Sequence, residues 1–253
     1  MIEVTLLSIL QGIAEFLPIS SSGHLVLGKH LLGLQEMGLR LDIFLHVGTL
    51  LAVFAFYFSV IRRIVVGREW AYFFKIVVSA VPAGIVGILL QKQFPETLAT
   101  LESPKAVGVA LVFTGFILTA TRFLPKGHQD VSFGRALWMG LAQAIAILPG
   151  VSRSGMTIAA ARLSRVEAEK CAEFSFLMSA PPIAGAALLE LLKGLGEASS
   201  GPEVSWGLTI YGAVLAAVVG YLSLKLLVKS LKSRWFWLFG PYCLLAGLLA
   251  LCF

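Results

Sequence analysis

The chain has very little charge for its length. Only 13% of its 253 residues are charged and 58% are hydrophobic, with a mean hydropathy of +0.88, whereas soluble proteins carry about 25% charged residues. This composition excludes an ordinary soluble fold and predicts an integral membrane protein. The net charge of +6 does not indicate nucleic acid as a partner, because the basic residues fall between apolar segments, where membrane topology explains them.

The chain also has few cysteines and lacks basic residues at its N-terminus. Cys171, Cys243 and Cys252 have no metal-binding spacing and no evident pairing, which predicts buried free thiols. Residues 1–10 contain Glu3 but no lysine or arginine, so they lack the basic start of a secretory signal peptide. We therefore expect the N-terminus to remain in the mature protein.

Long apolar segments dominate the chain instead. A helix needs roughly 20 apolar residues to cross a membrane, and six segments are long enough. They are residues 41–60, 71–91, 105–124, 173–192, 206–224 and 236–253. Two further apolar regions, 4–34 and 134–163, are interrupted at their centre by proline and serines. Each arm of these regions gives roughly 20 Å of helix, too short for a hydrocarbon core of about 30 Å, so they are predicted to be re-entrant hairpins.

Basic residues orient this arrangement in the membrane. If both interrupted regions are re-entrant, thirteen lysines and arginines lie on one face and five on the other, with Lys75 and Arg153 inside the membrane. The richer face is expected to be cytoplasmic, so that both termini lie outside. The first hairpin then enters from outside and the second from inside.

The two hairpins are copies of one pattern. Gln11 aligns with Gln143, Ser20 with Ser152, Ser22 with Ser154 and Gly23 with Gly155, each at an offset of 132 residues. After the hairpins, an acid opens the next span in both halves, Asp42 in one and Glu173 in the other. Oppositely oriented halves form an inverted repeat.

The predicted fold is therefore an all-α polytopic membrane protein with six transmembrane helices and two re-entrant helical hairpins. It forms a single membrane domain, residues 1–253, with an inverted-topology repeat. Repeat 1 covers residues 1–124 and repeat 2 covers residues 134–253, and each consists of a hairpin followed by three spans.

Prolines and serines at the centre of each hairpin predict a helix end followed by a helix start. Pro18 and Pro149 are expected to end the incoming helices, because proline removes a backbone donor and restricts the residue before it. The serines that follow are typical N-cap residues, and Gly23 and Gly155 allow close backbone approach. A helix N-terminus offers free N–H groups and the positive end of a dipole. Two such N-termini with Arg153 between them suggest a phosphate site.

Groups that can carry out chemistry gather in the first hairpin. Gln11 and Glu15 are four residues apart and share one helix face, and His24 follows Ser21 by three residues. Together with Arg153, these side chains are the parts needed for nucleophilic phosphoryl transfer. A charged group at mid-bilayer costs about 2.5 to 3.5 kcal/mol, so Glu15 and Arg153 are expected to be paired, hydrated or functional.

Purely structural roles are the alternative interpretation of the same residues. The serines could be helix caps only. Glu15 and Arg153 could form a structural ion pair between the repeats, and His24 could be hydrogen-bonded at an interface. Asp42 and His46, at the head of a span, are expected to be structural or interfacial. The duplication of the whole polar pattern at a fixed offset favours function.

These motifs carry a family resemblance. The stretch from Gln11 to His24, and Leu148-Pro-Gly-Val-Ser-Arg-Ser-Gly-Met-Thr157, resemble the two signature motifs of the bacterial undecaprenyl pyrophosphate phosphatases of the bacitracin-resistance type. The resemblance covers nearly the whole chain. It implies a multi-pass enzyme of the bacterial plasma membrane that removes the terminal phosphate of undecaprenyl pyrophosphate. That reaction recycles the lipid carrier of peptidoglycan synthesis.

The resemblance also implies roles for single residues. By motif position, Ser21 looks like the nucleophile, His24 like its acid/base partner and Arg153 like the phosphate clamp. Glu15 and Gln11 match an acidic motif associated with a divalent cation, Mg²⁺ or Ca²⁺. Many members have glutamate where this chain has Gln11, which leaves Glu15 as the main acidic candidate. The residues expected to bind substrate phosphates are Ser20, Ser22, Gly23, Ser152, Ser154, Gly155 and Thr157.

The expected reaction follows from these roles. Arg153 and the serine N–H groups hold the terminal phosphoryl group, Ser21 attacks phosphorus in line, and undecaprenyl phosphate leaves. His24 or Glu15 takes the serine proton, and water later opens the phosphoserine. Since the leaving group is itself a phosphate, charge neutralisation is the main task.

Two alternatives stay open. His24 could be the nucleophile, as in the type 2 phosphatidic acid phosphatases, which share Ser-Gly-His but need a later histidine motif that this chain lacks. The chain could also be a transporter that flips undecaprenyl phosphate, alone or after hydrolysis, because broken helices in inverted repeats are a transporter plan.

The remaining expectations concern partners and access. The reacting groups lie on the hairpin that enters from outside, so the site is expected to open externally and to take lipid from the outer leaflet. The expected partners are undecaprenyl pyrophosphate and membrane lipids. The sequence leaves open whether the chain forms a homo-oligomer.

Overall fold

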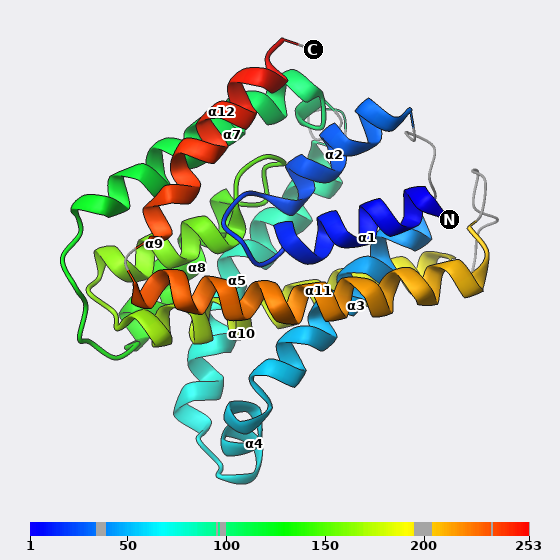
Figure 1. Ribbon diagram of the computed structural model, residues 1–253. Coiled ribbons are helices and arrows are strands. Elements are labelled where there is room, and N and C mark those ends of the chain that lie inside the picture. Colours follow the sequence, from blue (N-terminus) through cyan, green and yellow to red (C-terminus); the bar gives the residue numbers. More distant parts are fainter. Residues whose placement is uncertain (34–38, 95, 97–99, 195–203, 234, 253) are drawn as a thin grey trace.

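The computed structural model describes residues 1–33, 39–94, 96, 100–194, 204–233 and 235–252 (Figure 1). Within these residues the chain is helical, and strands are absent apart from one isolated bridge between Gln129 and Val166. The helices are α1 (Ile2–Ala14), α2 (Ser21–Leu32), α3 (Leu39–Phe56), α4 (Phe58–Val66), α5 (Trp70–Gln93), α7 (Pro104–Ala120), α8 (Phe133–Ile145), α9 (Arg153–Leu163), α10 (Ala168–Gly194), α11 (Trp206–Lys232) and α12 (Phe239–Ala250). Residue 34, the last of a predicted hairpin, and residue 253, the last of a predicted span, lie outside the described residues.

Long apolar helices occupy several of the predicted spans. Among the described residues, Trp70–Leu90, Pro104–Phe123 and Trp206–Lys232 are long and apolar enough to cross a membrane. A bent pair of helices would make a fourth span. The shorter α12 lies within the predicted span 236–253, and α10 covers the predicted span 173–192. The chain is therefore all-α with three to four candidate spans by length and composition.

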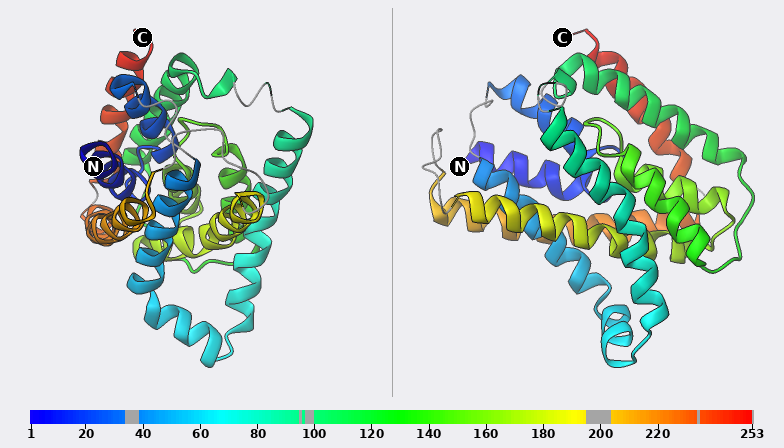
Figure 2. Two further views of the ribbon diagram at one scale, coloured as in Figure 1. Left: turned by 90° about the vertical axis from the view of Figure 1, so that its right-hand side faces the viewer. Right: turned by 180° about the vertical axis from the view of Figure 1, so that it is seen from behind.

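The predicted span 41–60 is not one straight helix. α3 ends at Phe56, α4 begins at Phe58, and the two helices meet at 72°. Tyr57 between them has left the helical conformation, with φ −101° and ψ 22°. Together, α4 and the adjoining ends of α3 and α5 form an arm that projects from the other helices (Figures 1 and 2).

Serine residues form the N-caps of three helices. Ser103, Ser132 and Ser205 precede α7, α8 and α11, and each accepts a hydrogen bond from the backbone N–H three residues later. The distances are 3.4, 3.3 and 3.4 Å. These caps satisfy one of the N–H groups that a helix start leaves without an acceptor. The same device recurs at the two hairpins described below.

Phe16 anchors the first hairpin turn in the core. Its side chain is 1% exposed, and its ring meets the ring of Phe176 on α10 edge to face, with 5.3 Å between centroids. Gly220 on α11 leaves room for the ring, because a Cβ at this position would lie 2.4 Å from it. Since Phe16 directly follows Glu15, this packing fixes the backbone from which the Glu15 side chain extends.

α5 presents an apolar face to the outside of the helical body. Phe73, Val77, Val81, Ile85 and Ile88 recur at helical spacing and are 40–56% exposed. A continuous apolar stripe of this kind suits contact with lipid rather than water. The surface thus agrees with the membrane protein predicted from composition.

The cysteines are free thiols, as predicted. Cys171 and Cys243 are buried. Cys252 is exposed, which corrects the expectation that all three are buried, because it lies beyond the last residue of α12.

Candidate active site

Two hairpin turns bring the starts of α2 and α9 together. The incoming helices end earlier than expected, α1 at Ala14 and α8 at Ile145, about one turn before Pro18 and Pro149. The prolines therefore lie inside the turns rather than at the helix ends. This places Glu15, the residue after α1, at the beginning of the first turn.

Ser20 and Ser152 cap the outgoing helices, as the sequence predicts. Ser20 Oγ accepts the N–H of Gly23 over 3.3 Å, and Ser152 Oγ accepts the N–H of Gly155 over 3.1 Å. Ser20 has a φ of 71°, which is uncommon for a residue with a side chain. The sharp turn at Ser20 brings Ser21, the first residue of α2, back towards the end of α1.

Glycine lets the tips of the two hairpins touch. A Cβ on Gly23 would lie 2.9 Å from the Cα atom of Gly150, which itself has a φ of 93°. Ser154 Oγ donates to the Leu17 carbonyl across the same contact, over 3.4 Å. The N-termini of α2 and α9 are consequently neighbours, as the two facing hairpins predict.

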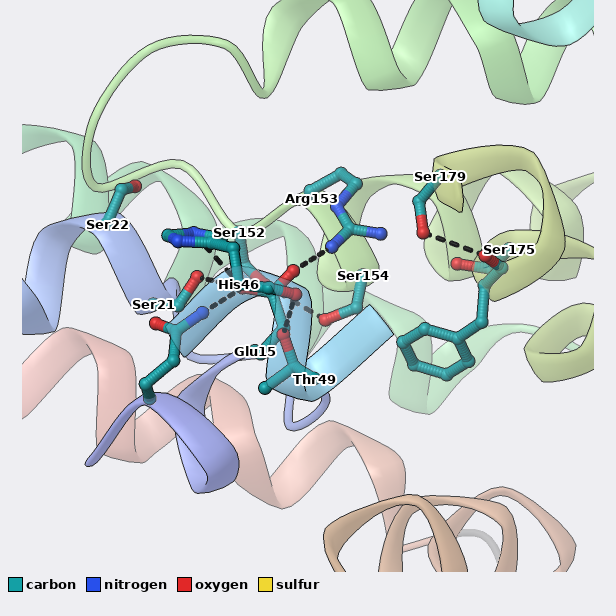
Figure 3. Close-up of polar contacts among 12 residues, drawn as sticks. Glu15, Ser21, Ser22, His46, Thr49, Ser152, Arg153, Ser154, Ser175 and Ser179 are labelled. Atoms are coloured by element: carbon teal, nitrogen blue, oxygen red, sulfur yellow. Dashed lines mark hydrogen bonds and ion pairs between the residues drawn. The ribbon is translucent and has the colours of Figure 1, made fainter. Parts of the chain in front are cut away.

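Glu15 receives polar contacts from both hairpins and from α3 (Figure 3). Its Oε2 atom accepts from Ser21 Oγ at 2.6 Å and from Gln11 Nε2 at 3.1 Å. Its Oε1 atom forms an ion pair with Nη2 of Arg153, and His46 Nε2 lies 3.9 Å from Oε2. The Glu15 side chain is 4% exposed and that of Arg153 is 18% exposed. Pairing therefore compensates a carboxylate charge that burial would otherwise make unfavourable.

A pocket of about 200 Å³ lies where the two tips meet. Its polar lining consists of Glu15, Ser20, Ser21, Ser22, His46, Ser152, Arg153 and Ser154. Nη1 of Arg153 is buried and has no hydrogen-bond partner within the described part of the chain. The guanidinium thus retains a donor for an oxyanion, while Glu15 occupies Nη2.

His24 is not turned towards Ser21. Its Nδ1 atom lies 2.9 Å from the carbonyl oxygen of Ser20, and its Nε2 atom lies 2.8 Å from the Tyr242 hydroxyl on α12. The two rings stack with 5.7 Å between centroids. Both ring nitrogens of the expected acid/base partner are therefore engaged with other groups.

Some expected phosphate-binding residues also have other partners. Thr157 Oγ1 lies 2.6 Å from Ser175 Oγ on α10 and 2.8 Å from the Arg153 carbonyl, so its hydroxyl serves helix packing. The N–H groups of Gly23 and Gly155 are taken by the capping serines. These three residues shape the tips but do not line the pocket described above.

His46 lines the pocket, although its sequence context predicts only a structural or interfacial role. Its Nδ1 atom lies 2.8 Å from the carbonyl oxygen of Asp42, one turn earlier on α3, which leaves Nε2 facing Glu15. Asp42 itself pairs with Lys29 of α2 over 2.5 Å. The signal available in the sequence was a histidine on the span that directly follows the reactive hairpin.

Comparison with known proteins matches nearly the whole chain. The family model described as "Bacitracin resistance protein BacA" covers residues 4–249. The chain belongs to this family. Three relatives share the printed name "Undecaprenyl-diphosphatase". The one from Halothermothrix orenii is 39% identical over 98% of this chain and 95% of its own length. Those from Desulforapulum autotrophicum and Thermotoga petrophila are each 37% identical over 97% of this chain, and over 95% and 97% of their own lengths.

In this BacA family member, the oxygen atoms around Glu15 are candidate ligands for a divalent cation. Among the described residues, no group of three His, Cys, Asp or Glu side chains could hold a metal ion. Next to Glu15, however, Gln11 Oε1 is buried and has no hydrogen-bond partner in the described part of the chain, and the Ser21 hydroxyl is close. Mg²⁺ typically takes one or two carboxylates and completes its shell with waters and substrate phosphates. These residues fit a cation that is bound jointly with a pyrophosphate.

Proposed function

We propose that this chain is a membrane lipid pyrophosphatase that converts undecaprenyl pyrophosphate to undecaprenyl phosphate and inorganic phosphate. The observation that carries the proposal is the 2.6 Å contact between Ser21 and Glu15, beside the Arg153 guanidinium, in a pocket between two helix N-termini. The names of the relatives support hydrolysis and do not favour the flippase alternative. The product returns the lipid carrier to peptidoglycan synthesis.

Binding of the terminal phosphoryl group depends on positive groups from both hairpins. Nη1 of the Arg153 guanidinium has no acceptor among the residues that the structure describes, and a guanidinium matches phosphate oxygens in pairs. The first N–H groups of α2 and α9 have no acceptor within their helices, and both helix dipoles present their positive ends there. Substrate would therefore draw Arg153 partly away from Glu15 and leave that carboxylate ready to accept a proton.

Ser21 is the proposed nucleophile. Its Oγ atom attacks the terminal phosphorus while its proton passes to Glu15, to which the hydroxyl already donates a hydrogen bond. The bond between phosphorus and the bridging oxygen breaks, and undecaprenyl phosphate leaves with that oxygen. Water then attacks the phosphorus of the phosphoserine, and the bond between phosphorus and Ser21 Oγ breaks. The proton that Glu15 received returns to Ser21 Oγ and regenerates the hydroxyl, while the proton of the attacking water leaves on inorganic phosphate.

His46 is a better placed acid/base partner than His24. Its Nε2 atom lies 3.9 Å from Glu15 Oε2 on the pocket wall, while its Nδ1 atom is held by the Asp42 carbonyl. An imidazole held in this way can take the proton onward from Glu15. His24, expected from the motif to fill this role, instead bridges the Ser20 turn and Tyr242, so we assign it to positioning α2.

A divalent cation, Mg²⁺ or Ca²⁺, would be held by Glu15, Gln11 Oε1 and the substrate oxygens. When bound, such an ion neutralises pyrophosphate charge and polarises the phosphoryl oxygens. With a single carboxylate from the protein, the site is expected to be weak until the lipid is present. The proton transfers described above use only the chain's own residues.

Six spans and two re-entrant hairpins in an inverted repeat are the proposed membrane plan. α1 has 13 residues, roughly 20 Å of helix, and falls short of a core of about 30 Å. The first helix of each repeat packs on a helix of the other repeat. α1 of repeat 1 packs on α11 of repeat 2, and α8 of repeat 2 packs on α5 of repeat 1. At these contacts a Cβ on Gly212 would lie 2.9 Å from Ser8 Oγ, and one on Gly140 would lie 2.4 Å from the Ser79 carbonyl oxygen. Ser8 and Gly140 are equivalent positions, 132 residues apart, so the pairing of serine with glycine supports the repeat.

The site is proposed to open to the external side of the bacterial plasma membrane. A second cavity of about 520 Å³ shares Ser22 and His46 with the pocket and reaches Lys29 and Pro104. Lys29, and Lys105 at the start of α7, are two of the five basic residues on the face that is predicted to be external, which supports this direction. In a Cys252→Ser background, the Ser22→Cys variant should react with an impermeant thiol reagent added outside intact cells. Labelling from the cytoplasmic side alone would contradict an external opening.

Phosphate release by the purified chain tests the function. The protein in detergent should release inorganic phosphate from undecaprenyl pyrophosphate, and the Ser21→Ala variant should not. A mock purification from cells that lack the chain is the control for contaminating phosphatases. A pure flippase would release none. Release at equal rates by both proteins would exclude Ser21 as the nucleophile, and no release by either would contradict hydrolysis.

A further inference from the structure

An apolar groove of about 280 Å³ lies between α7, α8 and α9. Alanines make up much of its lining, including Ala142 on α8 and Ala159 and Ala160 on α9. The hydroxyl of Thr121, which also lines the groove, donates to the Leu118 carbonyl over 2.6 Å and is already satisfied. The groove is therefore suited to a hydrocarbon ligand that makes no hydrogen bonds.

The groove and the phosphate pocket lie next to each other along α8 and α9. On α8, Ile145 lines the groove, and the next residues, Ala146 and Ile147, line the pocket. On α9, Ser154 lines the pocket and Met156 lines the groove. A ligand with phosphates in the pocket thus meets the groove along the same two helices.

We infer that this groove binds the isoprenoid chain of the substrate next to its pyrophosphate. The inference rests on the proposed function, which places a prenyl pyrophosphate in the adjoining pocket. A cavity of about 150 Å³ holds one benzene molecule, so the groove has room for roughly two isoprene units. The rest of a long chain extends into the bilayer. The alanine lining determines how much of the chain is bound by the protein and thereby favours prenyl over tail-less pyrophosphates.

Narrowing the groove should weaken binding of the tail selectively. The variants are Ala120→Leu, at an exposed position that lines the groove, and Ala142→Leu, at a buried one. Ala71→Leu is the matched control, because Ala71 is exposed on α5 and is not part of the groove lining. Farnesyl pyrophosphate and dimethylallyl pyrophosphate serve as substrates of three isoprene units and one. The full-length proteins are compared in the same detergent.

The measured quantity is the ratio of kcat/KM for farnesyl pyrophosphate to kcat/KM for dimethylallyl pyrophosphate. We expect this ratio to fall about tenfold in the groove variants, the effect of misfit in an apolar pocket, mainly through the KM for farnesyl pyrophosphate. Ala71→Leu should keep the wild-type ratio. Activity towards the short substrate reports separately on folding and on the phosphate pocket.

Several outcomes overturn the groove assignment. They are equal losses for both substrates, no loss for either, or the same change of ratio in Ala71→Leu. Groove occupancy by ordinary membrane lipid predicts no change of ratio and is excluded by the expected result. If the wild-type protein releases no phosphate from undecaprenyl pyrophosphate either, the proposed function is wrong, and the tail site falls with it.

Discussion

Glu15 and Arg153 are 138 residues apart in the chain, yet their side chains form an ion pair between the tips of the two hairpins. Glu15 directly follows the first incoming helix, and Arg153 begins the second outgoing helix. The pair therefore links the halves of the fold at the pocket itself. Its stability and its chemistry can be separated by substitution.

Removal of Arg153 should lower both stability and activity. Arg153→Gln leaves the Glu15 carboxylate buried without its partner, which costs about 3 kcal/mol for a broken buried pair. We expect a lower unfolding temperature in detergent and a loss of phosphate release of at least about a hundredfold. Thermal unfolding and phosphate release measure the two effects.

A double variant distinguishes these effects. Glu15→Gln/Arg153→Gln has no uncompensated charge and should recover most of the lost unfolding temperature. Its activity should stay low, because the phosphate clamp and the base are both gone. An active double variant would show that the pair is structural only.

Substitution of Ser21 should abolish hydrolysis without unfolding the protein. Ser21→Ala removes the proposed nucleophile, and loss of a nucleophile reduces turnover by at least about a thousandfold. Ser59→Ala is the control, because Ser59 is exposed on α4 and is not part of the pocket lining. Acid quenching of the wild-type reaction should trap phosphate on Ser21. A fully active Ser21→Ala protein would show that another group is the nucleophile.

The two histidines should differ in what they affect. His46→Gln removes the imidazole beside Glu15 and should reduce kcat by about a hundredfold, with little change in unfolding temperature. His24→Gln removes the hydrogen bond to Tyr242 and should chiefly lower the unfolding temperature, by the equivalent of about 1 kcal/mol. Steady-state kinetics and thermal unfolding of both variants test the assignment. The reverse pattern would restore His24 as the acid/base partner of Ser21.

The polar hairpins could be predicted because their pattern is local. Proline, serine and glycine determine where helices stop and start, and Ser20 and Ser152 cap α2 and α9 as their spacing indicates. An ion pair between Glu15 and Arg153 was one of the alternatives that the sequence left open, because a charge within a membrane is costly unless it is paired, hydrated or functional. These inferences depend on residue type and spacing alone.

Other features depend on packing that a single sequence does not encode locally. The approach of His46 to Glu15 requires α3 to lie beside the first hairpin, and the diversion of His24 requires Tyr242 of α12 to stack on its ring. The 72° bend at Tyr57 interrupts a run that is uniformly apolar in sequence. Tertiary contacts determine each of these features, so the periodicity of the sequence could not predict them.

Gly150 should not tolerate a side chain. Its φ of 93° disfavours any other residue, and an added Cβ would lie 2.7 Å from both Ala110 Cβ and the Val107 carbonyl oxygen. Gly150→Ala should therefore destabilise the protein by about 1 to 3 kcal/mol and reduce phosphate release by displacing the second tip. Gly84→Ala is the control, because Gly84 lies inside α5 with nothing near an added Cβ. Alanine is the better helix former by about 1 kcal/mol, so the control should match or exceed the wild-type unfolding temperature.

A divalent cation should be required for turnover but should bind weakly without lipid. Glu15 supplies the only carboxylate among the described pocket-lining residues, so the remaining ligands must come from Gln11 Oε1, water and substrate. Chelation with EDTA should reduce phosphate release by at least about a hundredfold, the scale of losing a metal that stabilises phosphoryl charge, and Mg²⁺ should restore it. Titration calorimetry should detect Mg²⁺ binding in the presence of a non-hydrolysable prenyl methylenediphosphonate, and much weaker binding in its absence. Full activity after chelation would show that Arg153 and the helix N-termini neutralise the pyrophosphate by themselves.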